Sequence, residues 1–292
     1  MIGAIGLLNA QNIGQQSKTI SEIRSLRLKK NIIERGRFII EGKKAVLETL
    51  CDKDFLTEVK YIVLSDKIDF NYIEKISFIN SYKYVKIYQI STELFNKISG
   101  DESPEGVLCV ASIPGRGAAG LINDDQKRLF ILLDSVNDPG NLGAVMRIAD
   151  NFGVSAVICE KNSVFEYLPK VIKSSMGSFK NITTVGMTSK LYETILSEVK
   201  KEETAVICSD NKAQITLSSA AAKIKTAKFK KVFLIGGSES HGVISGDIKN
   251  LCVSAKNFIN SSIPNYGRNE SLNLSVAMGI FCYEIAGAFY SK

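Results

Sequence analysis

The 292-residue sequence has no long apolar run and only one histidine, His241. Because a membrane-spanning helix needs about eighteen or more consecutive apolar residues, we expect no membrane partner. The N-terminal segment MIGAIGLLNAQ has no basic lead-in and too short an apolar core for a secretory signal. A phosphate-binding GxxxxGK(S/T) loop is also absent, which excludes a P-loop NTPase. His241 stands alone in a glycine-rich turn and is a weak candidate for a general base.

The six cysteines show no CxxC spacing, and most of them lie within apolar runs: Cys51, Cys109, Cys159, Cys208, Cys252 and Cys282. Zinc sites and redox motifs usually show closely spaced cysteine pairs. We therefore expect reduced, buried thiols, no metal site and a cytoplasmic location.

Basic residues are in excess, with a net charge of +7 and a pI near 8.9. Between Lys18 and Val46, nine Lys or Arg residues stand against three Glu residues. Such a run is often only a solvated helix face, but it also permits a surface that contacts nucleic-acid phosphates. Phe38 lies nearby and could stack on a base. The candidates for this contact are Arg24, Arg27, Lys29, Lys30, Arg35 and Arg37.

A glycine-rich stretch, PGRGAAGLINDDQKR at residues 114–128, shows neither helical nor strand periodicity and predicts a domain boundary. The expected units are a domain at 1–116, a linker at 117–128 and a domain at 129–292. Three apolar runs in the first unit predict strands at 61–66, 83–90 and 106–113. Helical patterns lie between them, including one that begins after Ser91 as an N-cap. This alternation predicts a small α/β domain.

The same alternation restarts after the boundary. Short and nearly continuous apolar runs predict strands at 129–134, 155–160, 203–210 and 231–237. Runs of this kind are typical of strands buried on both faces of a parallel sheet. We therefore expect an open α/β sheet with helices on both faces, and ligands outside the carboxyl ends of its strands.

Polar residues follow these strands. Asp138-Pro139-Gly140 turns the chain, and Asn141 is in position to cap a helix that carries Arg147 on an otherwise apolar segment. A buried arginine needs a partner, and facing an active cleft is a normal reason for one. Glu239 lies in a turn bracketed by glycines, where it could also simply complement a helix N-terminus. Asn269, Glu270, Ser271 and Asn273 crowd the start of the last apolar helix, which is more than capping needs.

Together, DPGNLGAVMRIADNFGV, LIGGSESHG and IPNYGRNESLNLSVA resemble, in order and spacing, the three motifs of the SpoU/TrmH RNA ribose 2′-O-methyltransferases of the SPOUT class. In addition, SEIRSLRLKKNIIERGRFIIEGKKAVLETL and SPEGVLCVAS resemble the ribosomal-protein-like substrate-binding domain of many members. The resemblance spans most of residues 18–290. It implies a small α/β/α RNA-binding domain and a C-terminal SPOUT domain tied in a deep trefoil knot.

The resemblance also implies S-adenosylmethionine as methyl donor, RNA as substrate and a homodimer formed through the C-terminal domain. Carried over residue by residue, the catalytic set is Asn141, Arg147, Glu239, Ser271 and Asn273. The implied cofactor contacts, largely through the backbone, are Gly237, Ile263 and Leu272. Two features depart from the family pattern: Asn265 stands where members usually have Met, and the segment from 242 to 263 is several residues longer.

Methylation of a ribose 2′-hydroxyl needs alignment and proton removal, because the sulfonium already activates the methyl group. We expect Arg147 to stabilise the developing alkoxide, since a guanidinium normally stays protonated, although it could instead act as the base. Ser271 and Asn273 are expected to orient Arg147 and the loop. Glu239 is expected to hold its glycine-rich turn or Asn141.

The additional N-terminal domain favours large-subunit ribosomal RNA as the substrate, because tRNA-modifying relatives usually lack it. A tRNA ribose 2′-O-methyltransferase is the alternative enzyme. An RNA-binding or ribosome-assembly factor without activity is a further alternative, although every catalytic position is filled. An antibiotic-resistance methyltransferase would use the same chemistry, and sequence does not separate it from a housekeeping enzyme.

Overall fold

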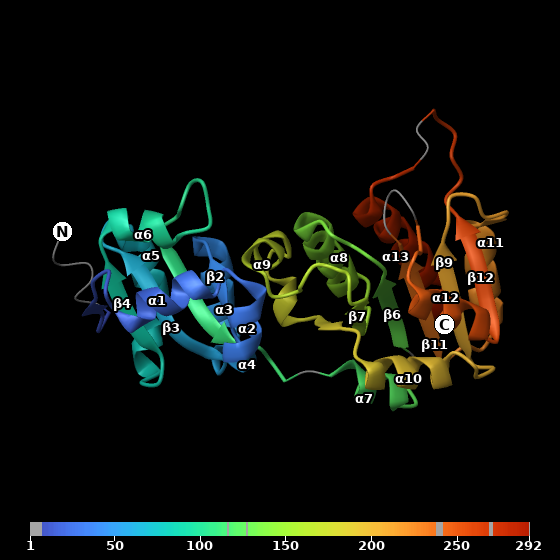
Figure 1. Ribbon diagram of the computed structural model, residues 1–292, viewed down its shortest axis with the longest axis horizontal. Coiled ribbons are helices and arrows are strands. Elements are labelled where there is room, and N and C mark those ends of the chain that lie inside the picture. The colour runs from blue at the N-terminus through green and yellow to red at the C-terminus, as the bar shows by residue number, and fades with distance from the viewer. Residues whose placement is uncertain (1–7, 116, 127, 238–241, 269–270, 292) are drawn as a thin grey trace. The chain divides into compact units, whose positions relative to one another are not determined.

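The computed structural model describes residues 8–115, 117–126, 128–237, 242–268 and 271–291. The chain divides into two compact units, which we call the N-terminal unit (Met1–Gly115 with Tyr167–Lys180) and the C-terminal unit (Arg116–Glu166 with Asn181–Lys292). Figure 1 labels the helices and strands of both units. Each unit is built on its own sheet.

The sheet of the N-terminal unit has five strands in the order β1-β4-β3-β5-β2. The strands are β1 (Gln11–Asn12), β4 (Lys86–Ile90), β3 (Val59–Ser65), β5 (Val107–Ser112) and β2 (Arg37–Glu41). β5 runs antiparallel to β3 and β2, whereas β1, β4 and β3 are mutually parallel. The predicted strands β3, β4 and β5 are confirmed, but β2 was not predicted because it lies inside the basic run.

Helices cover both faces of this sheet. They are α1 (Lys18–Ser25), α2 (Lys29–Arg35), α3 (Lys43–Cys51), α4 (Lys53–Leu56), α5 (Phe70–Ile76) and α6 (Thr92–Ile98), with a 3₁₀ turn η2 (Ser77–Ser81). The predicted cap is confirmed, since the Ser91 hydroxyl accepts from the Leu94 N–H at 3.3 Å. Alternate residues of β2 serve opposite faces: Arg37 bonds to Glu22 of α1, whereas the Phe38 ring packs against Phe55 of α4.

A segment of the second half of the sequence belongs to the N-terminal unit. It contains α9 (Pro169–Ser174) and the 3₁₀ turn η3 (Ser178–Lys180). The Phe38 ring lies 4.9 Å from the Tyr167 ring and 5.8 Å from the Phe179 ring, measured between centroids. Phe38 is therefore fully buried (0% exposed), and the prediction that it stacks on an RNA base is wrong. The expected boundary at residues 117–128 also failed to anticipate this segment, which covers an apolar face of β2.

The sheet of the C-terminal unit has seven strands, all parallel, in the order β10-β12-β9-β11-β6-β7-β8. The strands are β6 (Arg128–Leu133), β7 (Ala156–Cys159), β8 (Thr183–Gly186), β9 (Thr204–Ser209), β10 (Ile215–Thr216), β11 (Lys231–Gly236) and β12 (Asn257–Ser262). The predicted open parallel sheet and its strands β6, β7, β9 and β11 are confirmed. The sequence did not predict β8, β10 and β12, which carry many polar residues and lie toward the ends of the sheet.

Helices lie on both faces of this sheet, as predicted. α7 (Ala118–Asn123), α10 (Ser189–Glu198) and α12 (Gly246–Ser254) share one apolar core, while α8 (Pro139–Asn151), α11 (Leu217–Thr226) and α13 (Leu274–Tyr290) pack together. The expected linker therefore contains a helix, α7, whose Ala118 and Ile122 side chains are buried in that core. Among the described residues, no helix is long and apolar enough to cross a membrane.

Candidate active site

The loop after β6 starts α8 at a different residue from the one predicted. Asp138, not Asn141, is the N-cap: its Oδ1 accepts from the Asn141 N–H at 2.8 Å, and Pro139 occupies the first helical position. Proline suits that position because its fixed φ is helical and it lacks an N–H group. The Asn141 side chain is thus not used for capping, and the helix presents it at the carboxyl end of β6.

The third loop ends at Asn273, which caps α13. Its Oδ1 accepts from the Ser275 N–H at 2.9 Å and from the Val276 N–H at 3.4 Å. Its Nδ2 donates to Oδ1 of Asn141 at 3.0 Å. Two members of the predicted catalytic set, from the first and third motifs, are therefore in direct contact.

Arg147 is exposed on α8, about two turns after Asn141. Its neighbours Val145 and Met146 are buried, since successive helical residues point about 100° apart. The expectation of a buried arginine is therefore wrong for the single chain. Ser271 is exposed as well, and Glu239 lies outside the described residues, as does His241.

The predicted cofactor residues lie at one edge of the sheet. Gly237 directly follows β11 and Ile263 directly follows β12, and only β9 separates these strands, which places their ends about 10 Å apart. Leu272 precedes α13 and is 47% exposed. At Gly237 an added Cβ would lie 2.5 Å from the Val243 nitrogen and closer still to the Gly242 carbonyl. Bare backbone at Gly237, with the apolar residues Ile263 and Leu272 at the same edge of the sheet, fits a flat adenosine group.

A buried carboxylate that sequence reasoning did not single out lies at the same edge. Asp134 follows β6 and is 0% exposed. Its Oδ2 accepts from the N–H groups of Ile244 at 2.7 Å and Ser245 at 2.9 Å. The sequence offered one sign of Asp134: an acidic residue that directly follows an apolar strand. Fully buried acids are rare, so such a residue is a candidate for a specific role.

The cysteines are free thiols, of which Cys51 is exposed and Cys252 half-buried. Burial raises the pKa of Cys109, and it raises the pKa of Cys282 to about 12, so these thiols stay protonated. A hydrogen bond between the Cys208 and Cys252 thiols raises the pKa of Cys208 and lowers that of Cys252. The described residues contain no group of His, Cys, Asp or Glu that could hold a metal ion.

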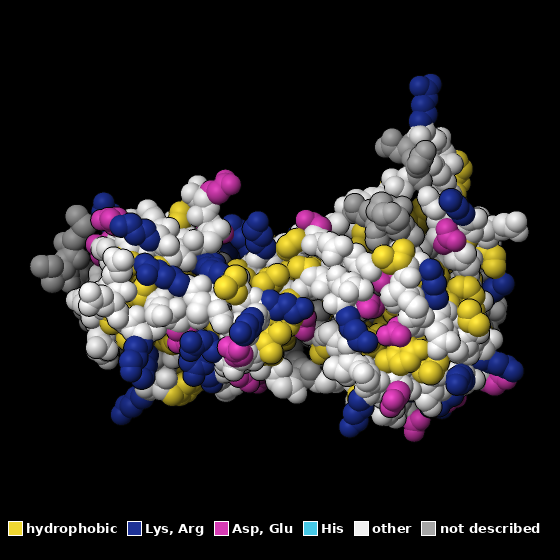
Figure 2. All heavy atoms as spheres, viewed as in Figure 1, with side chains coloured by type: hydrophobic (Ala, Val, Ile, Leu, Met, Phe, Trp, Pro, Cys, Tyr) yellow, Lys and Arg dark blue, Asp and Glu magenta, His cyan; other side chains and the backbone are white. Residues whose placement is uncertain are grey.

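The basic candidates of the N-terminal unit separate into two groups. Arg24, Lys29, Lys30 and Arg35 are exposed on α1 and α2. Arg27, by contrast, donates to Oε2 of Glu41 at 3.0 Å and to the Ile98 carbonyl at 2.6 Å. Arg37 pairs with Oε1 of Glu22 at 2.9 Å. Arg27 and Arg37 therefore tie the unit together. Figure 2 shows Lys and Arg side chains spread over the visible face of both units.

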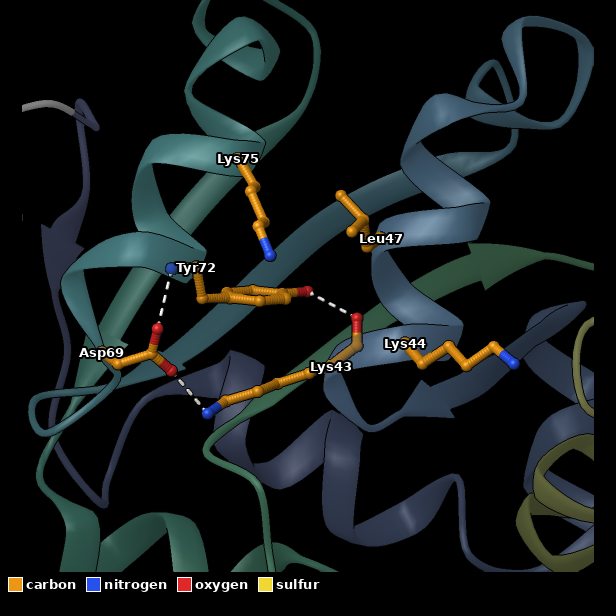
Figure 3. Close-up of a pocket in the computed structure, with 6 residues that line it drawn as sticks. All are labelled: Lys43, Lys44, Leu47, Asp69, Tyr72 and Lys75. Atoms are coloured by element: carbon orange, nitrogen blue, oxygen red, sulfur yellow. Dashed lines mark hydrogen bonds and ion pairs between the residues drawn. The ribbon is translucent and has the colours of Figure 1, made fainter.

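A pocket of ≈ 280 Å³ lies between α3 and α5 of the N-terminal unit, lined by Lys43, Lys44, Leu47, Asp69, Tyr72 and Lys75 (Figure 3). Lys43 pairs with Asp69 at 2.5 Å, and the Tyr72 hydroxyl donates to the Lys43 carbonyl at 3.0 Å. Burial raises the pKa of Tyr72, so its hydroxyl stays a donor. Lys75 reaches toward the Tyr72 ring and is exposed, while Lys44 points away. The pocket adds basic groups that the predicted set omitted.

The open parallel sheet, with asparagines from two motif loops joined at its carboxyl edge, agrees with the SPOUT-type methyltransferase unit that the resemblance implied. Residues 128–283 match the model of the SpoU rRNA Methylase family, and residues 17–109 match the MRM3-like substrate binding domain. The chain therefore belongs to the SpoU rRNA methylase family, which confirms the resemblance stated from its motifs.

Relatives match over both units. The 23S rRNA (guanosine(2553)-2′-O)-methyltransferase RlmP of Bacillus subtilis is 26% identical over 272 residues, which cover 93% of this chain and 97% of the relative. The 23S rRNA (guanosine-2′-O-)-methyltransferase RlmB of Ralstonia nicotianae is 32% identical over 209 residues, covering 68% of this chain and 76% of the relative. An AdoMet-bound rRNA methyltransferase from Sinorhizobium meliloti has the same fold, with a TM-score of 0.75, 21% identity and coverage of 97% and 99%.

Proposed function

We propose that this protein transfers a methyl group from S-adenosylmethionine to a ribose 2′-hydroxyl of large-subunit ribosomal RNA. The observation that carries the proposal is the bond between Asn141 and Asn273, which unites two motif loops at the ligand-binding edge of a parallel sheet. The B. subtilis relative named as a 23S rRNA methyltransferase aligns with 93% of the chain, which supports ribosomal RNA over tRNA.

S-adenosylmethionine supplies a methyl group that its sulfonium has already activated. The backbone at Gly237, together with Ile263 and Leu272 at the same edge of the sheet, would hold the adenosine and exclude water from it. Asn141 and Asn273 would fix the loops so that the ribose hydroxyl meets the methyl carbon in line. Arg147 would donate to the developing alkoxide, and one preorganised donor of this kind contributes about 3–4 kcal/mol.

A homodimer formed through the C-terminal unit would complete this site. One face of α13 leaves Val276, Tyr283, Gly287 and Tyr290 exposed at helical spacing, and Tyr283 is 67% exposed. Such an apolar row on the surface of a monomer is typical of an interface. α13 packs against α8, which carries Arg147, so a partner bound there would lie close to that arginine. We also propose the trefoil knot of the family and a cytoplasmic location, which the free thiols support.

The N-terminal unit would dock the RNA through charge. Its exposed basic residues on α1 and α2, together with Lys75 at the α3–α5 pocket, would contact phosphates. A substrate recognised through its 2′-hydroxyl must be RNA and not DNA.

Transfer of labelled methyl from S-adenosylmethionine to unmodified ribosomal RNA, with tRNA in parallel, tests the proposal. We expect nuclease-resistant label in ribosomal RNA, because a methylated ribose 2′-oxygen can no longer attack the adjacent phosphodiester. We also expect this label to be lost with Arg147→Ala. Label in tRNA alone would keep the chemistry and overturn the substrate. Cofactor binding without transfer to free RNA or to ribosomal particles would instead support an inactive RNA-binding factor.

A further inference from the structure

The side-chain carboxyl group of Asp134 is buried in the C-terminal unit. It accepts two backbone hydrogen bonds through Oδ2, from Ile244 and Ser245, and one through Oδ1 from the Ser135 hydroxyl at 3.0 Å. An ionised carboxylate that is removed from water costs free energy unless such donors compensate for it. Burial of an apolar residue here would cost less free energy, so we ask what the hydrogen bonds of Asp134 hold in place.

The charge is compensated by backbone groups. Ser245 is the N-cap of α12, so the carboxylate lies at the positive end of that helix. Among the ion pairs of the described residues, none includes Asp134. Because both partners of its Oδ2 are main-chain N–H groups, the position of Asp134 determines the path of the backbone at residues 244–245.

The backbone held in this way lies beside the end of β11. The chain leaves the strand at Gly237 and returns beside it at Gly242 and Val243, so closely that a Cβ on Gly237 would overlap both. Gly242 has a φ of +64°, which favours glycine. Asp134 binds the next two residues, Ile244 and Ser245. Asp134, directly after β6, therefore holds the segment that packs against Gly237.

Asp134 also connects this turn to the loop that carries Asn141. Its N–H donates to the Gly236 carbonyl at 2.9 Å, which joins the ends of β6 and β11. Four residues later, Asp138 caps α8 and sets the position of Asn141, which bonds to Asn273. A continuous series of contacts thus runs through all three motif loops, and Asp134 is where the first two meet.

We propose that Asp134 is a positioning residue for the methyl-transfer reaction: it fixes the backbone of residues 242–245 beside Gly237, so that Gly237 presents its own backbone to S-adenosylmethionine. The inference rests on the proposed function, because Gly237 is taken as a cofactor contact. Asp134 itself does not touch the reacting atoms in this proposal. Its removal should weaken cofactor binding and leave RNA binding by the N-terminal unit unchanged.

The test compares Asp134→Ala with Asp134→Asn in the full-length protein. Asp134→Ala leaves the N–H groups of Ile244 and Ser245 without their acceptor, so we expect the Kd for S-adenosylmethionine, measured by calorimetry, to rise about tenfold to a hundredfold. Asp134→Asn keeps a carbonyl oxygen but loses the charge, and a partial effect of about threefold is expected. The KM for S-adenosylmethionine should rise with the Kd, while the KM for RNA stays constant.

A matched control is Glu198→Gln. Glu198 is also buried (2% exposed) and accepts from the Thr204 hydroxyl at 2.7 Å, but Thr204 is the first residue of β9, at the opposite edge of the same sheet. This variant should unfold more easily and still bind S-adenosylmethionine like the wild type. The comparison therefore distinguishes a loss of cofactor affinity in the Asp134 variants from a general loss of stability.

Two results would overturn the inference. One is a folded Asp134→Ala protein with the affinity of the wild type for S-adenosylmethionine. The other, if Asp134→Ala does not fold, is unchanged affinity in Asp134→Asn together with unchanged amide hydrogen exchange at Ile244 and Ser245. A wild-type protein that fails to bind S-adenosylmethionine would instead count against the proposed function itself.

Discussion

The side-chain amide of Asn273 donates to the Oδ1 of Asn141 at 3.0 Å, across 132 residues of sequence. Each residue also stands at a helix start, Asn273 as the N-cap of α13 and Asn141 in the first turn of α8. The bond therefore fixes two helix N-termini relative to each other at the carboxyl edge of the sheet. Helix N-termini present free N–H groups and positive partial charge, which suits the anionic groups of an RNA substrate.

Asn273→Ser should separate the capping role of Asn273 from its bond to Asn141. Serine caps a helix about as well as asparagine but does not reach Asn141, so the stability should change by less than about 0.5 kcal/mol. The rate of methyl transfer should fall about tenfold or more, because the two loops lose their mutual alignment. Thermal unfolding and single-turnover kinetics measure the two effects. Asn273→Ala, which loses both roles, should also lower the stability by about 1 kcal/mol.

Arg147→Ala should reduce turnover with RNA and leave stability unchanged. Loss of one preorganised donor costs about 3–4 kcal/mol of transition-state stabilisation, a decrease in kcat of about 100-fold to 1000-fold. Because Arg147 is exposed in the single chain, the free energy of unfolding of the protein should change little. Asn151→Ala, also exposed on α8, is the control that should retain activity. Near-normal kcat in Arg147→Ala would remove Arg147 from the catalytic set.

Gly237→Ala should destabilise the C-terminal unit, since the added Cβ meets the backbone of Gly242 and Val243. Backbone cannot move aside as a flexible side chain can, so we expect a loss of about 3 kcal/mol in denaturant unfolding. Gly246→Ala is the matched control, because a Cβ added at this first residue of α12 would meet no atom within 4 Å. That variant should be neutral or slightly stabilising.

Phe179→Ala should loosen the N-terminal unit although residue 179 follows β6 and β7 of the C-terminal unit in the sequence. Phe179 is 3% exposed and packs edge-on against Phe38 and Phe55. Removal of a buried phenylalanine costs about 3–5 kcal/mol, so the amides of β2 should exchange their hydrogens faster. Lys170→Ala, exposed on α9, should leave exchange unchanged. Equal exchange in Phe179→Ala and the wild type would show that this segment does not support β2.

Charge reversal at Arg24 and Lys30 should flatten the dependence of RNA affinity on salt. Each lost phosphate contact lowers the slope by roughly 0.7–0.9. Lys75→Glu tests the α3–α5 pocket in the same way, and Lys200→Glu in the C-terminal unit is the control with an expected unchanged slope. If only Lys75→Glu changes the slope, the RNA-binding surface lies at the α3–α5 pocket and not on α1 and α2.

Much of this protein could be predicted from local patterns in its sequence. Continuous apolar runs predicted the central strands β6, β9 and β11, because a strand buried on both faces needs apolar residues throughout. The three motifs predicted the family, and the resemblance they carry placed Asn141 and Asn273 in one expected catalytic set. Each of these inferences uses residues that are close in sequence or a motif that is read as a unit.

Only the tertiary structure decided which residues that are distant in sequence contact one another. It assigned the cap of α8 to Asp138, engaged Arg27 and Arg37 in ion pairs inside the N-terminal unit, and buried Phe38 under Tyr167 and Phe179. It also placed Asp134 against Ile244 and Ser245, which lie 110 and 111 positions further along the sequence. The reason is physical: periodicity shows which face of an element is apolar, but not which remote segment covers that face or satisfies a buried charge.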